Sequence, residues 1–287
     1  MGVVINTNIS SITASRILSE NRADLEKAME RLASGKRINS ANDDAAGMAV
    51  AAKMRADIRS LNQAVRNTND AISLVNTYDG AASEIESILI RMRELAVQAK
   101  NGTYEDADRT NADYEYAALK NEITRIAGVS AFNRMTVAST TGTTGTTTSG
   151  DKSFSFYVGS DVAKTGNTVT FSSKALDLNI AVTGSTLNSV INTTSAGDAV
   201  GNLDLAIYQL AANRSQAGAL VNRLEHTVSN LMNVSQRLQE AVSGIEDADY
   251  AAESAALARG MVLAQAGTAM LAQANQAPNF ILALLRG

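Results

Sequence analysis

The longest regular pattern in the sequence lies near its C-terminal end, where apolar residues recur at alternating spacings of three and four. The pattern runs without a fault from Ile207 to Ile245, and ten of its twelve positions are apolar. The positions are Ile207, Leu210, Arg214, Ala217, Val221, Leu224, Val228, Leu231, Ser235, Leu238, Val242 and Ile245. A seven-residue period held this long is typical of a coiled-coil seam. At about 1.5 Å per residue, it predicts a helix on the order of 60 Å long.

A helix of that length needs a partner of comparable length, and a second stripe supplies one. Apolar residues follow the same spacing from Ile58 to Ala99, with a skip at Tyr78-Asp79-Gly80. The stripe stops before Asn101-Gly102, a pair that favours a helix C-cap and a turn. We therefore predict two long helices packed on one another.

The two chain ends carry a weaker helical pattern. Residues 251–287 contain twelve Ala, which favour helix but bury little area, so this segment is expected to be poorly stable as a lone helix. The N-terminal stretch has the same marginal balance and is its natural partner. Its apolar residues are Ile9, Ile12, Leu18, Leu25 and Leu32.

The middle of the chain, about 138–199, has a different composition. Residues 139–150 are all Ser, Thr or Gly, which predicts an exposed loop without a core. Three short runs then alternate apolar and polar residues, as strands with one apolar face do. Their apolar positions are Phe154, Phe156 and Val158; Val169 and Phe171; and Leu176, Leu178, Ile180 and Val182. The expected fold is mainly α: a long antiparallel coiled-coil-like helical bundle formed by the two chain ends, with a small β insert in the middle.

Composition and charge narrow the chemistry. The chain has no Cys and one His, so thiolate zinc sites, thiol nucleophiles and two-His metal sites are excluded. A net charge of −4 gives no basic field for nucleic acid. No run of 18 apolar residues and no basic, then apolar, leader is present, so neither membrane insertion nor a cleaved signal peptide is expected. His226 is interpreted as a surface helix residue. Asp43-Asp44 and Asp247-Ala248-Asp249 are interpreted as helix-start caps and solvated charges rather than a cation site.

Several tracts, in order along the chain, resemble bacterial flagellins, the subunits of the flagellar filament. The longest is RLASGKRINSANDDAAGMA, from Arg31 to Ala49. The others are INTN at residues 5–8, RMRELAVQ at 91–98, NRLE at 222–225 and QAGTAMLAQANQ at 265–276. One departure is Phe132-Asn133-Arg134, where relatives usually have Phe-Asn-Gly. Ile90 likewise stands where Gln is more usual.

The resemblance implies a structural subunit, not an enzyme, that polymerises with itself into a filament for swimming motility and needs no cofactor. It assigns residues 1–40 and 246–287 to inner-core terminal helices, 41–137 and 200–245 to an outer helical core, and 138–199 to a variable surface insert. It also implies export through the flagellum's own type III channel without a cleaved signal peptide. The partners it implies are the filament cap, hook-junction proteins and an export chaperone.

Three sets of residues carry expectations from the resemblance or the pattern. Burial between subunits is expected for Leu257, Met261, Leu263, Met270 and Leu271. Contact with a host Toll-like receptor for flagellin is implied for Arg91, Leu95 and Glu115, with subunit packing as an equal alternative. O-glycosylation, or a bare loop, is expected at the hydroxyl residues of the low-complexity run. These are Ser139, Thr140, Thr141, Thr143, Thr144, Thr146, Thr147, Thr148 and Ser149.

Two other functions remain open at this point. A hook–filament junction protein has helical ends of the same kind, and a cytoplasmic coiled-coil scaffold would explain the heptads. The tracts at Arg37 to Ala46 and Gln265 to Gln276 favour the filament subunit over both.

Overall fold

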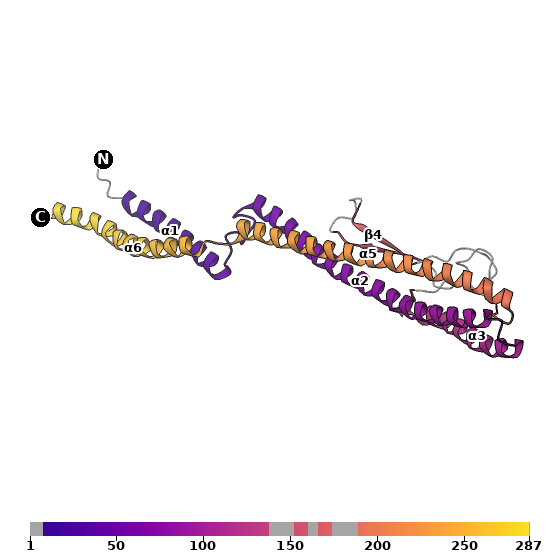
Figure 1. Ribbon diagram of the computed structural model, residues 1–287. Helices are drawn as coiled ribbons and strands as arrows, with labels where there is room; N and C mark the ends of the chain where they lie inside the picture. The colour runs from indigo at the N-terminus through magenta and orange to yellow at the C-terminus, as the bar shows by residue number, and fades with distance from the viewer. Residues whose placement is uncertain (1–7, 138–151, 160–165, 174–188, 287) are drawn as a thin grey trace. The chain divides into compact units, whose positions relative to one another are not determined.

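Helices form most of the chain that the structure describes. The computed structural model describes residues 8–137, 152–159, 166–173 and 189–286, with side chains up to residue 276. The helices are α1 (Ile9–Ser34), α2 (Ala45–Lys100), α3 (Asp106–Val129), α5 (Thr193–Glu246) and α6 (Tyr250–Arg286) (Figure 1). The chain divides into two units: Met1–Ile58 with Gln236–Gly287, and Arg59–Ser235. The expected mainly helical fold with a small β insert is confirmed.

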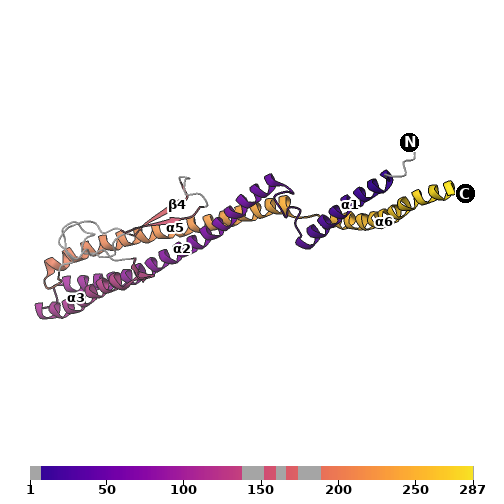
Figure 2. The ribbon, with the colours of Figure 1, turned by 180° about the vertical axis from the view of Figure 1, so that it is seen from behind.

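The second unit is built on α2 and α5, which lie side by side in both ribbon views (Figures 1 and 2). Ser235 hydrogen-bonds to Asn62, and Arg214 binds Asp79 at 2.8 Å, so the two helices run antiparallel. Every position of the stripe from Ile207 to Ile245 is buried or half-buried, as the seven-residue period predicts. Helix α5 begins at Thr193, ahead of the expected boundary at 200, and Ala196 and Ala199 are already buried.

Helix α2 continues through the skip in its apolar pattern. Tyr78 is 1% exposed and packs into the core with Val75 and Ala82, so the skip is a local change of register and not a break. The helix ends at Lys100, as Asn101-Gly102 predicts. Arg109 of α3 then donates to the carbonyls of Ala99 and Asn101, which satisfies the free C-terminal carbonyls of α2 and folds α3 back along it.

Two small antiparallel hairpins complete the second unit. Strands β1 (Ala131–Phe132) and β2 (Met135–Thr136) form one, and β3 (Lys152–Tyr157) and β4 (Thr168–Ser173) form the other. In the second, Phe154 pairs with Phe171, which confirms two of the three predicted strands. The third, 176–182, and the Ser/Thr/Gly run lie outside the described residues. The β1–β2 hairpin and the separate helix α3 were not predicted as elements.

The β1–β2 turn uses two residues with left-handed backbone. Asn133 has φ 48° and Arg134 has φ 65°. Asn enters this region readily, but an arginine there carries the steric cost that a glycine avoids. The chain therefore keeps a glycine-type turn without the glycine.

In the first unit, α1 and α6 lie side by side and antiparallel (Figures 1 and 2). Asn8 donates to the Ala274 carbonyl at 2.7 Å, and at the other end Arg31 binds Glu253 at 2.8 Å. This confirms the predicted pairing of the two chain ends. The more buried positions of α1 follow a strict alternation of three and four: Ser11, Ala14, Leu18, Asn21, Leu25, Ala28 and Leu32. Those of α6 do the same: Leu257, Gly260, Ala264, Gly267, Leu271 and Ala274.

Candidate assembly surface

The helix pair α1–α6 buries few of its own side chains. In α1 only Leu18 and Ala28 are buried, and of the α6 residues 250–276, whose side chains are described, none is buried. The seam explains this, because its α6 side is mostly Ala and Gly. Leu25 packs on Gly260 and Leu18 on Gly267, so each leucine meets a residue without a side chain. The pair gains little apolar burial per turn, and the earlier expectation of marginal stability follows from its geometry.

Large apolar side chains are instead exposed on the outer faces of both helices. The exposed fraction of each of these residues lies between 43% and 66%. On α1 they are Ile9, Ile12, Ile17 and Met29, and on α6 they are Met261, Val262, Leu263 and Met270. Ile9 and Ile12, which the sequence suggested as contacts to the C-terminal helix, thus point away from the seam. The seam was missed there because its positions are small or polar residues rather than large apolar ones.

A groove between the two helices collects part of this apolar surface. Its volume is about 510 Å³. Its lining residues are Ile9, Ser10, Thr13, Ala14, Ile17, Asn21, Leu263, Ala266, Gly267 and Met270. Carboxylates, histidines and basic groups are absent from this set, so the groove suits an apolar side chain and not catalysis.

The five expected packing residues of α6 divide between two faces. Leu257 and Leu271 are half-buried on the seam with α1, whereas Met261, Leu263 and Met270 are exposed by 53%, 44% and 65%. Only the last three are therefore available to another chain.

One segment of the described chain, Tyr250–Gln276, is long and apolar enough by length and composition to cross a membrane. Its mean hydropathy reaches 1.2 over 18 residues, and none of that window is buried. The sequence pattern did not indicate it, because polar residues such as Arg259 and Gln265 interrupt the apolar run, whereas the mean hydropathy of the segment stays high. An apolar surface exposed to this extent is expected to be covered by contact with another molecule.

The links between the helices of this unit carry a cluster of polar contacts. Arg37 N–H donates to the Glu246 carbonyl at 2.6 Å, and Ala248 N–H donates to the Gly35 carbonyl at 3.0 Å, which makes a short antiparallel bridge. The Glu246 carboxylate, 7% exposed, accepts from both terminal nitrogens of Arg55 at 3.1 Å. Lys36 Nζ lies 3.8 Å from the same carboxylate. The sequence reading did not single out Glu246, because a lone Glu at a helix end has no distinctive pattern.

One residue of each acidic cluster caps the start of a helix, as predicted. Asp44 accepts from the Gly47 amide at the start of α2, and Asp249 accepts from Ala251 and Ala252 at the start of α6. Asp43 binds Lys27 at 2.9 Å and accepts from Ser40 and Asn39. These contacts, led by the Lys27 hydrogen bond, hold the pKa of Asp43 well below its ordinary value.

The described residues offer no metal-binding cluster. Among them, no group of three or more Asp, Glu or His side chains is placed to hold an ion. His226 is exposed on α5.

Of the three residues expected at a receptor surface, Arg91 and Glu115 are exposed and Leu95 is buried. Arg91 binds Glu115 across α2 and α3 at 2.9 Å and Glu94 at 3.0 Å, with both Arg91 and Glu115 about half exposed. The Glu115 hydrogen bond, followed by that of Glu94, raises the pKa of Arg91. Leu95 is 3% exposed and belongs to the core of this unit. Only Arg91 and Glu115 therefore present atoms to a partner.

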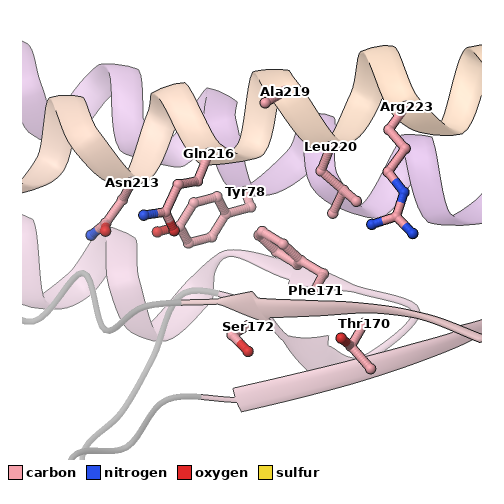
Figure 3. Close-up of a pocket in the computed structure, with 9 residues that line it drawn as sticks. All are labelled: Tyr78, Thr170, Phe171, Ser172, Asn213, Gln216, Ala219, Leu220 and Arg223. Carbon is pink, nitrogen blue, oxygen red and sulfur yellow. The ribbon is translucent and has the colours of Figure 1, made fainter.

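A second cavity, of about 380 Å³, lies between β4 and α5 (Figure 3). Phe171 points from β4 towards Tyr78, and the two rings meet edge to face at 5.3 Å. Thr170 and Ser172, the polar residues beside Phe171, point away from α5 in the same view. The cavity is thus a gap beside an aromatic contact that seats the hairpin, with no convergent set of reactive groups.

Comparison with known proteins gives this geometry a context. The family profile for the bacterial flagellin N-terminal helical region matches residues 5–143, and that for the bacterial flagellin C-terminal helical region matches residues 200–285. A flagellin from Halalkalibacterium halodurans is 41% identical over 284 residues, which cover 99% of this chain and 100% of the relative. The chain belongs to the bacterial flagellin family.

Other relatives agree with this assignment. Flagellin FlaB2 of Treponema pallidum is 38% identical over 291 residues, covering 99% of this chain and 100% of the relative. A solved structure described as a flagellar hook-associated protein from Vibrio parahaemolyticus has a TM-score of 0.58 at 13% identity. It covers 71% of this chain and all of its own, and it shows a shared fold alone.

This flagellin is a structural subunit of the extracellular flagellar filament, polymerises with copies of itself, and is not an enzyme. The hook–filament junction and cytoplasmic scaffold alternatives are not favoured.

Proposed function

We propose that this flagellin joins the filament through the exposed apolar side chains of α1 and α6, with Met261, Leu263 and Met270 buried between subunits. The observation that supports this most is the absence of any buried side chain among α6 residues 250–276, in a segment of high mean hydropathy. Fully burying one Met or Leu side chain contributes about 1.5–3 kcal/mol. A surface that carries several such residues gains most when a second copy covers it.

The same surface supports separate positions in the filament for three parts of the chain. Residues 1–40 and 246–287 form the inner core of the filament, 41–137 and 200–245 its outer helical core, and 138–199 the outward-facing insert. Ordering the terminal residues costs about 1–2 kcal/mol for each backbone unit fixed, which the seam of α1–α6, with its small residues on α6, does not offset by itself. The terminal segments are therefore disordered in the soluble subunit and helical in the polymer.

Substitution of Met270 tests the assembly surface. Met270→Asp places a charge on the exposed face of α6 and is expected to prevent filament growth from purified subunits. Met270→Leu keeps an apolar side chain of similar volume and serves as the matched control that still polymerises. The thermal unfolding of the second unit stays unchanged in both, because Met270 belongs to the first. Normal filaments of Met270→Asp under electron microscopy would refute the proposal.

We also propose, on the basis of family resemblance, that the chain is exported without a cleaved signal peptide and with the help of a chaperone. It is then added to the filament beneath a cap and beyond the hook-junction proteins. The intact mass of the chain recovered from filaments tests the first point. A mass equal to the 30.1 kDa of the chain is expected from an uncleaved, unmodified subunit. Additional mass that maps to residues 139–149 would support O-glycosylation there, and loss of N-terminal residues would overturn export without cleavage.

We also propose that Arg91 and Glu115 make the contact with a host Toll-like receptor, while Leu95 acts beneath them by holding α2 in the core. Arg91→Ala is expected to weaken receptor activation by monomeric subunits without unfolding the second unit. Exposed ion pairs contribute only about 0–1 kcal/mol to stability, so a large fall in melting temperature would mean that packing, not recognition, explains these residues.

A further inference from the structure

The leucine contacts in the seam between α1 and α6 do not by themselves determine its register. Leu18, Leu25 and Leu32 recur every seven residues in α1, and Gly260, Gly267 and Ala274 recur every seven residues in α6. In the structure Leu25 meets Gly260 and Leu18 meets Gly267. If α1 slides by one heptad towards the C-terminal end of α6, Leu32 faces Gly260, Leu25 faces Gly267 and Leu18 faces Ala274. Each leucine then still packs on a small residue, and the slip breaks only polar contacts near the two ends, such as those from Asn8 to Ala274 and from Arg31 to Glu253.

The chain itself allows this slip. One heptad of helix is about 10 Å long. The link from Gly35 to Asp44 joins α1 to α2, and an extended chain covers about 3.3 Å per residue, so the link has enough length to follow α1 through the slip. Other contacts must therefore fix the position of this link.

We propose that Glu246 sets the register of α1 on α6 by fastening the link at Gly35–Arg37 to the end of α5. Its carbonyl accepts from Arg37 N–H at 2.6 Å, and its buried carboxylate binds Arg55 at 3.1 Å and Lys36 at 3.8 Å. Arg37 also donates through its guanidinium to the Ile245 carbonyl at 2.7 Å. These contacts hold Gly35 directly beside Ala248, just before the start of α6.

This fastening acts where slip must be resisted. With Gly35 hydrogen-bonded to Ala248, the end of α1 is held level with the start of α6, and Arg31 meets Glu253 one turn further on. Removing the Glu246 carboxylate takes away the ion pairs with Arg55 and Lys36, so the link is then held only by its backbone hydrogen bonds and the Arg37 side chain. Glu246 is thus a positioning residue for assembly, because a slipped pair presents the exposed apolar residues of α1 and α6 in the wrong relation to each other. The inference concerns contacts within one chain and holds whichever outer side chains join neighbouring subunits.

Engineered disulfides test this directly, since the natural chain has no cysteine to interfere. A Cβ at Gly260 would lie 3.5 Å from Leu25 Cβ, within the range of a disulfide. Leu25→Cys with Gly260→Cys therefore reports the native register, and Leu25→Cys with Gly267→Cys reports the slipped one. Each pair is placed in the natural background, in Glu246→Ala and in Glu240→Ala, the last being an exposed carboxylate of α5 as control. A minority of each variant is co-assembled with excess natural subunit and then oxidised.

Intramolecular cross-links, which keep the monomer's size on a denaturing gel, are counted for both pairs. The natural and Glu240→Ala backgrounds are expected to give only the native pair, and Glu246→Ala at least a tenfold higher ratio of slipped to native pair. If Glu246→Ala fails to enter filaments, the native-register disulfide formed before assembly is expected to restore its incorporation. Native cross-links alone in Glu246→Ala filaments, or failure of the disulfide to rescue a non-assembling variant, would overturn the proposal.

Discussion

Leu25 of α1 lies directly over Gly260 of α6, close enough that a Cβ on the glycine would stand 3.5 Å from the leucine Cβ. That distance is an ordinary van der Waals contact, so the space between Leu25 and Gly260 has room for about one methyl group. A pair of helices built on such contacts approaches closely but buries little. The marginal stability of the chain ends is therefore a property of specific positions and is open to change by single substitutions.

Gly260→Ala is expected to stabilise the terminal helix pair by about 0.5–1 kcal/mol, because alanine lowers the entropy lost on helix formation and the added methyl fits beneath Leu25. Circular dichroism of the soluble subunit should show more helix than the natural chain does. Gly267→Ala is the comparison: its Cβ would approach Leu18 Cδ1 to 3.2 Å, so Leu18 must shift and the gain is smaller. Equal effects of both changes would count against this packing.

Arg134→Gly is expected to raise the stability of the second unit by about 1 kcal/mol, since glycine adopts the left-handed backbone at no steric cost. For a unit of this size that corresponds to about 2–4 °C in melting temperature. Arg134→Ala retains the steric cost and is the control that leaves the melting temperature unchanged. A gain of the same size in the alanine variant would assign the effect to the arginine side chain instead.

Asp43 gives the first unit a dependence on acid pH. Its pKa is lowered in the folded chain, first by Lys27 and then by Ser40, so its contribution is fully present above its ordinary pKa of 3.8 and is lost as the pH falls below that value. Asp43→Asn is expected to lower filament stability at neutral pH and to flatten its decline between pH 4 and pH 2. Filament melting followed against pH measures this.

Asp24→Asn is the matched control for that experiment, because Asp24 is exposed on α1. Its pH profile should overlay that of the natural chain. An unaltered profile in Asp43→Asn would show that the Lys27 pair does not link protonation to stability.

The sequence predicted those parts of the fold that depend on large apolar residues. The stripe from Ile207 to Ile245 identified α5 and its seam, because each apolar side chain there is buried or half-buried. The pairing of α1 with α6 was predicted, but the seam on α6 escaped detection because Gly260 and Gly267 carry no side chain to mark it, and Ile9 of α1 faces outward. Glu246 escaped for a different reason: its partners, Arg55 and Lys36, are remote in sequence and meet only in the folded chain.

The candidate site residues show the same division. Met261, Leu263 and Met270 were expected to contact other subunits, and their exposure leaves them free to do so. Leu257 and Leu271 were grouped with them on hydrophobicity, yet helical phase turns both towards α1. Composition identifies an apolar helix, whereas the faces become distinct only when the partner helix is in place.

Amide hydrogen exchange across α6 tests most directly the claim that burial between subunits orders the chain ends. Residues 257–271 are expected to exchange quickly in the soluble subunit and to be protected by at least about a hundredfold more in filaments of the same chain. The core of the second unit, around Leu89 and Leu203, serves as the internal reference and should be protected in both states. Strong protection of Leu257 to Leu271 in the soluble subunit would contradict the account.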